Sequence, residues 1–246
     1  MADVILVVLD RPEAAPGLLA AAGCLAALTG SARIKALAAD PALRPAFETW
    51  TNGPVQPGPA VEVVVAGGDL AEAVDLRGRR ADIVVIAQPR PDDTKQTREA
   101  FRAALFQTER PILVVPPTRA RSFGHRVVIA WRDDERAIKA VMPALRFLGR
   151  AEAVHLVTGV REGAEKHATA REVPKVFIEH GINAQLHVLP IGSAPFGQTL
   201  LGKAHELAAD MLVMGAYAHS RLRDLILGGL TRHILSNADV PAFMRH

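Results

Sequence analysis

Short apolar runs rich in Val and Ile recur along the chain in two successive sets, and this pattern constrains the fold more than any other feature. The first set lies at residues 4–9, 32–38, 61–65, 82–87 and 111–116, and the second at 126–131, 151–158, 184–190, 210–215 and 241–246. Continuous apolar runs of this length are typical of parallel β-strands that are buried on both faces.

Segments with helical periodicity fill the intervals between these strands. They predict helices over about 13–28, 40–50, 69–79 and 97–109 in the first half, and over about 133–149, 166–180, 197–208 and 229–238 in the second. Strands that alternate with helices form a parallel sheet with helices on both faces. We therefore predict an α/β fold of two tandem, doubly wound, five-stranded parallel sheets of Rossmann-like type.

The two halves also match each other in sequence. "ADIVVIA" at 81–87 corresponds to "ADMLVMG" at 209–215, and "TERPILVVP" at 108–116 corresponds to "ADVPAFMRH" at 238–246. Self-similarity of this kind indicates a duplicated structural unit.

A linker separates the halves. The stretch "PPTRARSFGH" at 116–125 carries prolines and basic residues and has weak patterning, as linkers commonly do. The predicted domains are therefore 1–118 and 124–246, the first with a degenerate ligand loop and the second with a partly retained glycine loop.

Composition favours a cytoplasmic globular protein and excludes few functions. Of the 246 residues, 49% are apolar, and the net charge is only +3, which is too small an excess to predict nucleic-acid binding. A single cysteine, Cys24, excludes an internal disulfide framework and fits a reducing compartment. The opening "MADVILVVLDRP" lacks the basic lead and length of a signal peptide, and no run reaches a membrane span, so we expect no membrane partner.

Glycines in "MLVMGAYAHSRLRDLILGGLTRHIL" at 211–235 indicate a candidate ligand site. Gly215 ends a predicted strand, where ligands bind in open α/β sheets. Gly228 and Gly229 open the next helix, whose unpaired backbone N–H groups suit phosphate oxygens. Arg221 in between would favour an anion. The alternative is that the glycines only form tight turns.

These residues resemble the universal stress proteins in their tandem two-domain form. Nucleotide-binding members of that family carry G-x2-G-x9-G-[ST] between the fourth strand and the last helix. Gly215, Ala218 and the pair Gly228-Gly229 stand in that frame here. The prolines before each fifth strand and the duplication extend the resemblance over nearly the whole chain.

The resemblance implies a nucleotide site in the second half, with some departures. Ala218 replaces the second glycine of the motif, and Gly229 replaces the Ser or Thr, with Thr231 two positions later. The family keeps an acidic residue after the first strand, where this half has Arg132. On this reading Arg132 faces phosphate, and the backbone near Val157 lies beside the base.

The first half departs in the opposite way. Asp10 keeps the acidic position after the first strand, but the glycine positions hold Ala87, Arg90 and the pair Ala100-Phe101. Neighbouring residues would remove N–H donors or repel phosphate: Pro89, Pro91, Asp92 and Asp93. We therefore predict that the nucleotide site of the first half is lost.

Three further residues bear on a site. His155 and His187 lie in neighbouring predicted strands and could form a metal pair, but no Cys or carboxylate completes a ligand set, which favours ordinary sheet histidines. Trp131 follows a strand and could stack on a base or pack against the sheet.

By resemblance, the predicted function is stress response by a non-catalytic sensor or adaptor, with an adenine nucleotide such as ATP, bound with Mg, as its effector. One alternative is a slow ATP hydrolase or adenylyl-group transferase, for which Asp224 is the nearby acid. Another is a pure protein-interaction module with no nucleotide site. The resemblance also implies an internal pseudo-dimer of the two halves, and it leaves a homodimer and an unknown protein partner open.

Overall fold

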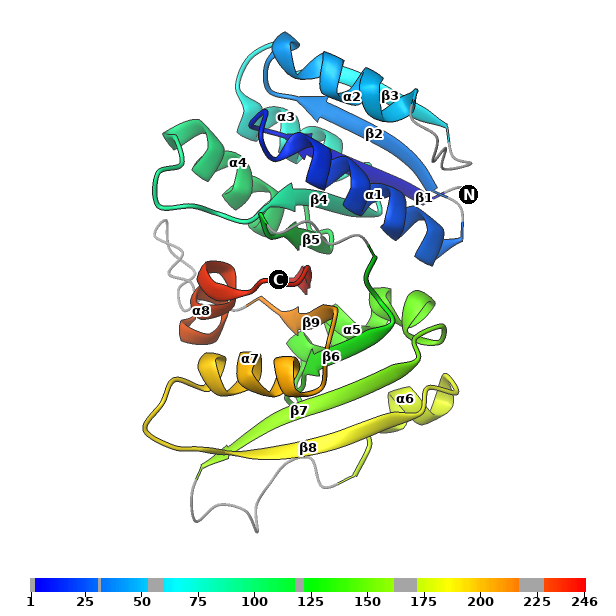
Figure 1. Cartoon of the computed structure of the whole chain (residues 1–246), viewed down its shortest axis with the longest axis vertical. Helices are drawn as coiled ribbons and strands as arrows, with labels where there is room; N and C mark the ends of the chain where they lie inside the picture. Colours follow the sequence, from blue (N-terminus) through cyan, green and yellow to red (C-terminus); the bar gives the residue numbers. More distant parts are fainter. Residues whose placement is uncertain (1–2, 31, 53–59, 118–121, 162–171, 217–227) are drawn as a thin grey trace. The chain divides into compact units, whose positions relative to one another are not determined.

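The structure is a computed structural model that describes residues 3–30, 32–52, 60–117, 122–161, 172–216 and 228–246. The chain divides into two compact units, Met1–Ser122 (unit 1) and Phe123–His246 (unit 2). Each contains a parallel sheet with helices on both faces (Figure 1). The predicted fold of two doubly wound, five-stranded sheets is confirmed.

Unit 1 alternates strands and helices along its whole length. Its elements are β1 (Asp3–Leu9), α1 (Ala15–Thr29), β2 (Ala32–Ala38), the 3₁₀ turn η1 (Pro41–Leu43), α2 (Arg44–Thr51), β3 (Val61–Val65), α3 (Leu70–Gly78), β4 (Ile83–Ala87), α4 (Lys95–Phe106) and β5 (Ile112–Val115). The strands coincide with the apolar runs of the sequence to within about one residue at each end.

Unit 2 repeats this order. Its elements are β6 (Arg126–Ala130), α5 (Glu135–Leu148), β7 (Ala153–Arg161), α6 (Lys175–Glu179), β8 (Ala184–Ile191), α7 (Phe196–Glu206), β9 (Met211–Gly215), α8 (Gly229–Asn237) and β10 (Ala242–Arg245).

The two sheets have the same strand order. It is β3-β2-β1-β4-β5 in unit 1 and β8-β7-β6-β9-β10 in unit 2, with parallel pairing throughout each of these series. The order reverses direction between β1 and β4, and between β6 and β9. Ligands of open α/β sheets bind outside the carboxyl ends of the strands at such a reversal, so each unit has one expected site position.

An aspartate before the fourth strand anchors the first strand in both units. In unit 1, Asp82 accepts a hydrogen bond from the Val4 N–H at 2.7 Å. In unit 2, Asp210 accepts from the N–H groups of Gly124, His125 and Arg126 at 2.8, 3.1 and 3.2 Å. This shared contact is structural support for the duplication read from the sequence.

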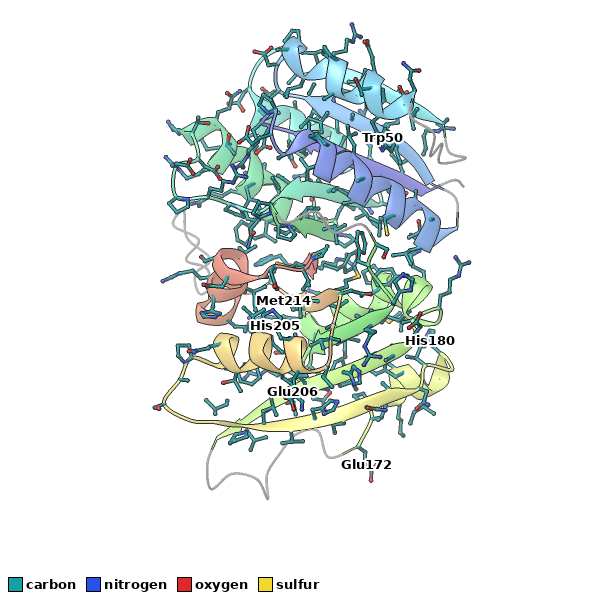
Figure 2. All side chains as sticks on the ribbon, in the orientation of Figure 1. Trp50, Glu172, His180, His205, Glu206 and Met214 are labelled. Carbon is teal, nitrogen blue, oxygen red and sulfur yellow. The ribbon has the colours of Figure 1, made fainter. Side chains whose placement is uncertain are left out.

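The helices of each unit cover both faces of its sheet. In unit 1, α1 and α2 pack together on one face and α3 and α4 on the other; in unit 2, α7 and α8 pack together while α5 lies against β9 and β10 (Figure 1). The central strands between them are buried, as Met214 of β9 illustrates, whereas the single tryptophan of unit 1, Trp50, is half-buried on α2 (Figure 2). The core of each unit therefore lies around its central strands.

Two elements of unit 2 differ from the sequence prediction. Of the predicted helix 166–180, residues 166–171 lie outside the described residues. In the described part, α6 covers 175–179 and begins after Pro174, because proline disfavours helical backbone in the residue before it. Strand β7 runs past its predicted end to Arg161. A Cβ on Gly159 would lie 2.7 Å from the Phe196 ring, so glycine is needed there for close packing and does not end the strand.

Candidate functional site

Three of the predicted site residues of unit 2 lie on adjacent strands at the carboxyl edge of the sheet. Arg132 follows β6, Gly215 ends β9, and Val157 lies in β7 level with Ala130, the last residue of β6. Because β9, β6 and β7 are neighbours in the sheet, the fold brings these positions to the point where the strand order reverses.

Gly215 has a packing role. A Cβ built on it would lie 3.0 Å from the Arg136 carbonyl oxygen and 3.1 Å from the carbonyl carbon. Arg136 belongs to the first turn of α5, which is fixed by Asp134, whose carboxylate accepts from the Arg136 and Ala137 N–H groups at 3.0 Å each. The close approach of a capped helix therefore explains this glycine without a ligand.

The start of α8 has a different character. Gly228 is its buried N-cap residue and has no side chain to cap the helix. Gly229 is exposed, and a Cβ added to it would meet no atom of the described residues within 4 Å. Within the described part of the chain, the backbone at this helix start is therefore not covered by a neighbouring side chain. Thr231, by contrast, is fully buried in the first turn of α8.

Arg132 presents a cation at the same edge. Its side chain is 74% exposed, and its Nε lies 3.7 Å from Asp134 Oδ2. An ion pair this long and this exposed holds the guanidinium weakly. Arg132 can therefore reach toward an anion at the carboxyl edge of the sheet.

Val157 and Trp131 are engaged within the fold. The Val157 carbonyl accepts the Trp131 N–H at 2.9 Å, so this oxygen already has a donor. The Trp131 ring is buried and meets the Phe177 ring edge-on at a centroid distance of 5.5 Å. Of the two readings of Trp131, the structure shows packing. Its indole nitrogen Nε1 is buried without an acceptor among the described residues.

Residues 217–227 of the candidate loop lie outside the described residues, and four of them bear on the predicted site or its alternatives. They are Ala218 and Arg221, which were predicted to line the nucleotide site, the neighbouring His219, and Asp224 of the hydrolase alternative.

The matching edge of unit 1 holds a buried ion network. Asp10 Oδ2 lies 2.8 Å from Arg11 Nη2, and Arg11 Nη1 lies 2.7 Å from Asp93 Oδ1. All three side chains are nearly buried. Burial by itself would lower the pKa of Arg11, but the hydrogen bonds and charges of Asp10 and Asp93 outweigh it, so the pKa of Arg11 lies above its ordinary value. Asp10, which holds the acidic position after the first strand, is thus paired with Arg11.

The two units carry acidic and basic residues in opposite order just after their first strand. Asp10 and Arg11 follow β1 of unit 1, while Arg132 and Asp133 follow β6 of unit 2. The acid of unit 1 is buried, and the arginine of unit 2 is exposed. The two units therefore differ at this edge: the acid of unit 1 is held inside an ion network, and the arginine of unit 2 faces outward.

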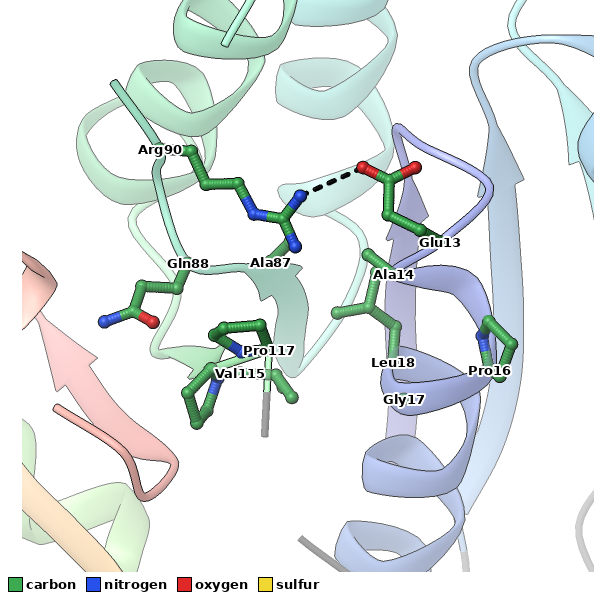
Figure 3. A pocket seen from close by; sticks show the side chains of 11 residues that line it. Glu13, Ala14, Pro16, Gly17, Leu18, Ala87, Gln88, Arg90, Val115 and Pro117 are labelled. Carbon is green, nitrogen blue, oxygen red and sulfur yellow. Dashed lines mark hydrogen bonds and ion pairs between the residues drawn. The ribbon is translucent and has the colours of Figure 1, made fainter. Parts of the chain in front are cut away.

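A small cavity of about 80 Å³ lies beside this network in unit 1. The first turn of α1 forms one wall, and the ends of β4 and β5 form the other (Figure 3). Ligand pockets for molecules of nucleotide size enclose about 300–1,000 Å³. The cavity is too small for a nucleotide.

The two sheet histidines of unit 2 form a contact of their own. His155 Nδ1 and His187 Nε2 lie 3.1 Å apart. Burial lowers the pKa of both, and the charges of Arg126 and Lys203 lower the pKa of His155 further. Both rings are therefore neutral near pH 7. Among the described residues, no group of three His, Cys, Asp or Glu side chains could hold a metal ion.

The arrangement defines a class of protein: two doubly wound α/β units in tandem, each with a site position where the strand order reverses. Solved structures have this fold over nearly their whole length. A universal stress protein from Archaeoglobus fulgidus DSM 4304 matches with a TM-score of 0.72 and 16% identity over 98% of this chain and 97% of that one. A protein described as a universal stress protein, from Pseudomonas aeruginosa UCBPP-PA14, matches with a TM-score of 0.71 and 17% identity over 99% and 93%.

A curated relative adds a match in sequence. The universal stress protein Slr1230 of Synechocystis sp. is 29% identical over 90 residues, which are 36% of this chain and 30% of that relative. The match thus spans less than a third of that relative's length. No protein-family model matches the chain. The chain has the fold of the universal stress proteins, and its resemblance to that family is confirmed.

Sequence reasoning missed the ion network of unit 1. The sequence predicts only that Asp93 repels phosphate, whereas in the structure Asp93 pairs with Arg11 and accepts the Arg90 N–H at 2.8 Å. The adjacency of Asp10 and Arg11 was the one available signal.

No helix in the described parts of the chain has the length and apolar character needed to cross a membrane.

Proposed function

We propose that the chain is a cytoplasmic stress-response protein that performs no chemistry itself and binds an adenine nucleotide such as ATP, with Mg, in unit 2. The stress role rests on the resemblance to the universal stress proteins. The nucleotide site rests on one observation, the open start of α8 at Gly228 and Gly229.

The corresponding helix of unit 1 provides the contrast. Helix α4 has Thr94 as its N-cap residue, and the Thr94 hydroxyl accepts the Thr97 N–H at 3.2 Å. In α8 the N-cap residue is Gly228, and no side chain in the described part of the chain caps the helix. A helix start without a capping side chain leaves N–H donors that a phosphate oxygen can satisfy, and the helix dipole favours the negative charge.

Charge supports the same ligand. In this proposal the Gly228 and Gly229 backbone holds the phosphates, Arg132 pairs with a phosphate oxygen, and Gly215 shapes the site by packing. The proposal also includes the residues to which the family motif gives a role in binding the nucleotide, namely Ala218, Arg221 and Thr231. An internal pseudo-dimer of the two halves, a homodimer and a protein partner belong to the same proposal.

The test is calorimetry and thermal unfolding of the full chain with ATP, ADP and AMP, each with Mg. At a hundred times its dissociation constant, a bound ligand raises the free energy of unfolding by about 2.7 kcal/mol. Gly229→Asp places a carboxylate where the phosphate would lie and should abolish the effect. Gly202→Asp is the matched control, since Gly202 is an exposed helical glycine of unit 2 whose Cβ would also meet nothing within 4 Å.

Two other results would redirect the assignment. If no nucleotide binds or stabilises the chain, the interaction module is the better reading, and the buried Thr231 and the packing role of Gly215 already favour it. Release of phosphate or pyrophosphate from ATP would instead support the hydrolase or adenylyl-transferase alternative.

A further inference from the structure

We propose that the cavity of unit 1 binds a small zwitterion of the α-amino acid class with a short apolar side chain. This inference concerns a different unit from the proposed nucleotide site and does not depend on it. The cavity lies at the point where the strand order of unit 1 reverses, where α/β sheets place their ligands.

The charges at the cavity select the ligand. Arg90 Nη1 lies 3.0 Å from Glu13 Oε1, and both side chains line the cavity, as Figure 3 shows. Glu13 would repel a simple anion, and Arg90 would repel a simple cation. A zwitterion satisfies both, because its carboxylate can pair with Arg90 and its ammonium with Glu13. One ion pair is then exchanged for two.

The existing ion pair is easy to open. The Arg90 side chain is 33% exposed and the Glu13 side chain 57%. Exposed ion pairs contribute little to stability, since water competes for both partners. A ligand that separates the two charges therefore lowers the stability of the fold only a little.

The backbone that carries Arg90 is held firmly. The Arg90 N–H donates to Asp93 Oδ2 at 2.8 Å, and Asp93 is tied through Arg11 to Asp10 at the end of β1. The guanidinium of Arg98 also donates to the Asp93 carbonyl. The buried network thus fixes the wall of the cavity while the Arg90 side chain stays accessible, which limits the ordering that binding requires.

Size and lining complete the match. A water molecule in a protein needs about 10–15 Å³ of cavity volume, so about 80 Å³ admits about five to eight water-sized groups. Alanine and valine fall in this range. Leu18, Val115 and Pro117 line the cavity and offer apolar surface to a short side chain, while the Gln88 amide also lies in the wall (Figure 3).

The experiment is an NMR titration of the full ¹⁵N-labelled chain with L-alanine and L-valine, read at the Gly17 and Gln88 amides beside the cavity. Isovalerate and isobutylamine are the matched probes, because each keeps the apolar part of valine and one of its charges. We expect saturable shifts with the amino acids and at least about tenfold weaker binding of either probe.

Variants separate binding from folding. Arg90→Gln and Glu13→Gln should each abolish the shifts, whereas Arg79→Gln, which breaks an exposed ion pair with Asp75 elsewhere in unit 1, should leave them intact. Gly17→Leu should fill the cavity and abolish binding without loss of stability, because a Cβ on Gly17 would meet nothing within 4 Å and glycine weakens a helix.

Three outcomes would overturn the proposal. They are the absence of saturable shifts up to about 10 mM amino acid, isovalerate or isobutylamine binding as tightly as valine, and unchanged binding in Arg90→Gln. The last two outcomes would show that the cavity does not recognise both charges of the ligand.

Discussion

Replacement of Gly215 by alanine tests whether this glycine serves packing. The added methyl would lie 3.0 Å from the Arg136 carbonyl oxygen, closer than ordinary van der Waals contact. The Asp134 cap holds that turn of α5 in place, so the overlap cannot be relieved cheaply. Overpacking of a well-packed core destabilises by about 1–3 kcal/mol, and we expect a loss of this size for unit 2.

The assay uses the tryptophans. Trp131 lies in unit 2 and Trp50 in unit 1, and the chain has 2 tryptophans in all, so a Trp50→Phe background makes fluorescence report on unit 2. Linear extrapolation of the urea unfolding curve then gives the free energy of unfolding of unit 2. Gly229→Ala is the control, since its methyl would meet no atom of the described residues within 4 Å. We expect it to be neutral or to stabilise by about 0.4–1 kcal/mol through the unfolded chain.

A double-mutant cycle sharpens the test. Asp134→Ala removes the cap and lets the first turn of α5 shift, so the loss caused by Gly215→Ala should shrink in that background. A Gly215→Ala variant as stable as the parent would refute the packing argument. The glycine at position 215 would then need another explanation, such as contact with a ligand.

Three further predictions concern single side chains of unit 2. Asp134→Ala should destabilise unit 2 by about 0.5–2 kcal/mol through loss of the α5 cap, with exposed Asp133→Ala as the neutral control; equal effects of both in urea unfolding would contradict this. Asp210→Ala should cost about 1–3 kcal/mol, because backbone N–H groups at the start of β6 lose their acceptor, and hydrogen exchange of the Arg126 amide should speed up. The third prediction concerns pH. Burial, and the charge of Lys203, lower the pKa of His155 and His187, while Glu206 opposes this at His187, so the unfolded chain binds more protons just below the ordinary histidine pKa of about 6.5. Stability of unit 2 should therefore fall as pH drops through about 6.5, and His187→Gln should flatten that dependence; an unchanged pH profile would show that the pair does not carry it.

The strands were predictable because burial on both faces leaves a continuous apolar run in the sequence, as in "IVVIA" of β4. The limits of α6 and β7 were not, because they depend on Pro174 and on the distant Phe196 ring beside Gly159. Periodicity carries no information about a contact between residues that are far apart in the chain.

The candidate site was likewise predictable only in part. The sequence placed Gly228 and Gly229 at a helix start and Arg132 after a strand, and the structure has them there. It could not reveal that Gly215 faces the Arg136 backbone, because that neighbour lies on another element of the unit. Whether these residues hold a nucleotide stays a prediction.

Unit 1 has Asp10 and Arg11 where unit 2 has Arg132 and Asp133. This difference has a consequence for the ratio in which the two kinds of edge occur in the cell. Both versions of the edge are encoded in one polypeptide, so each molecule carries one of each, whatever its expression level. A pair of separate single-unit proteins would need matched synthesis to achieve that ratio. Fusion therefore fixes a one-to-one ratio between two sheet edges of unlike charge, and neither edge can be diluted relative to the other.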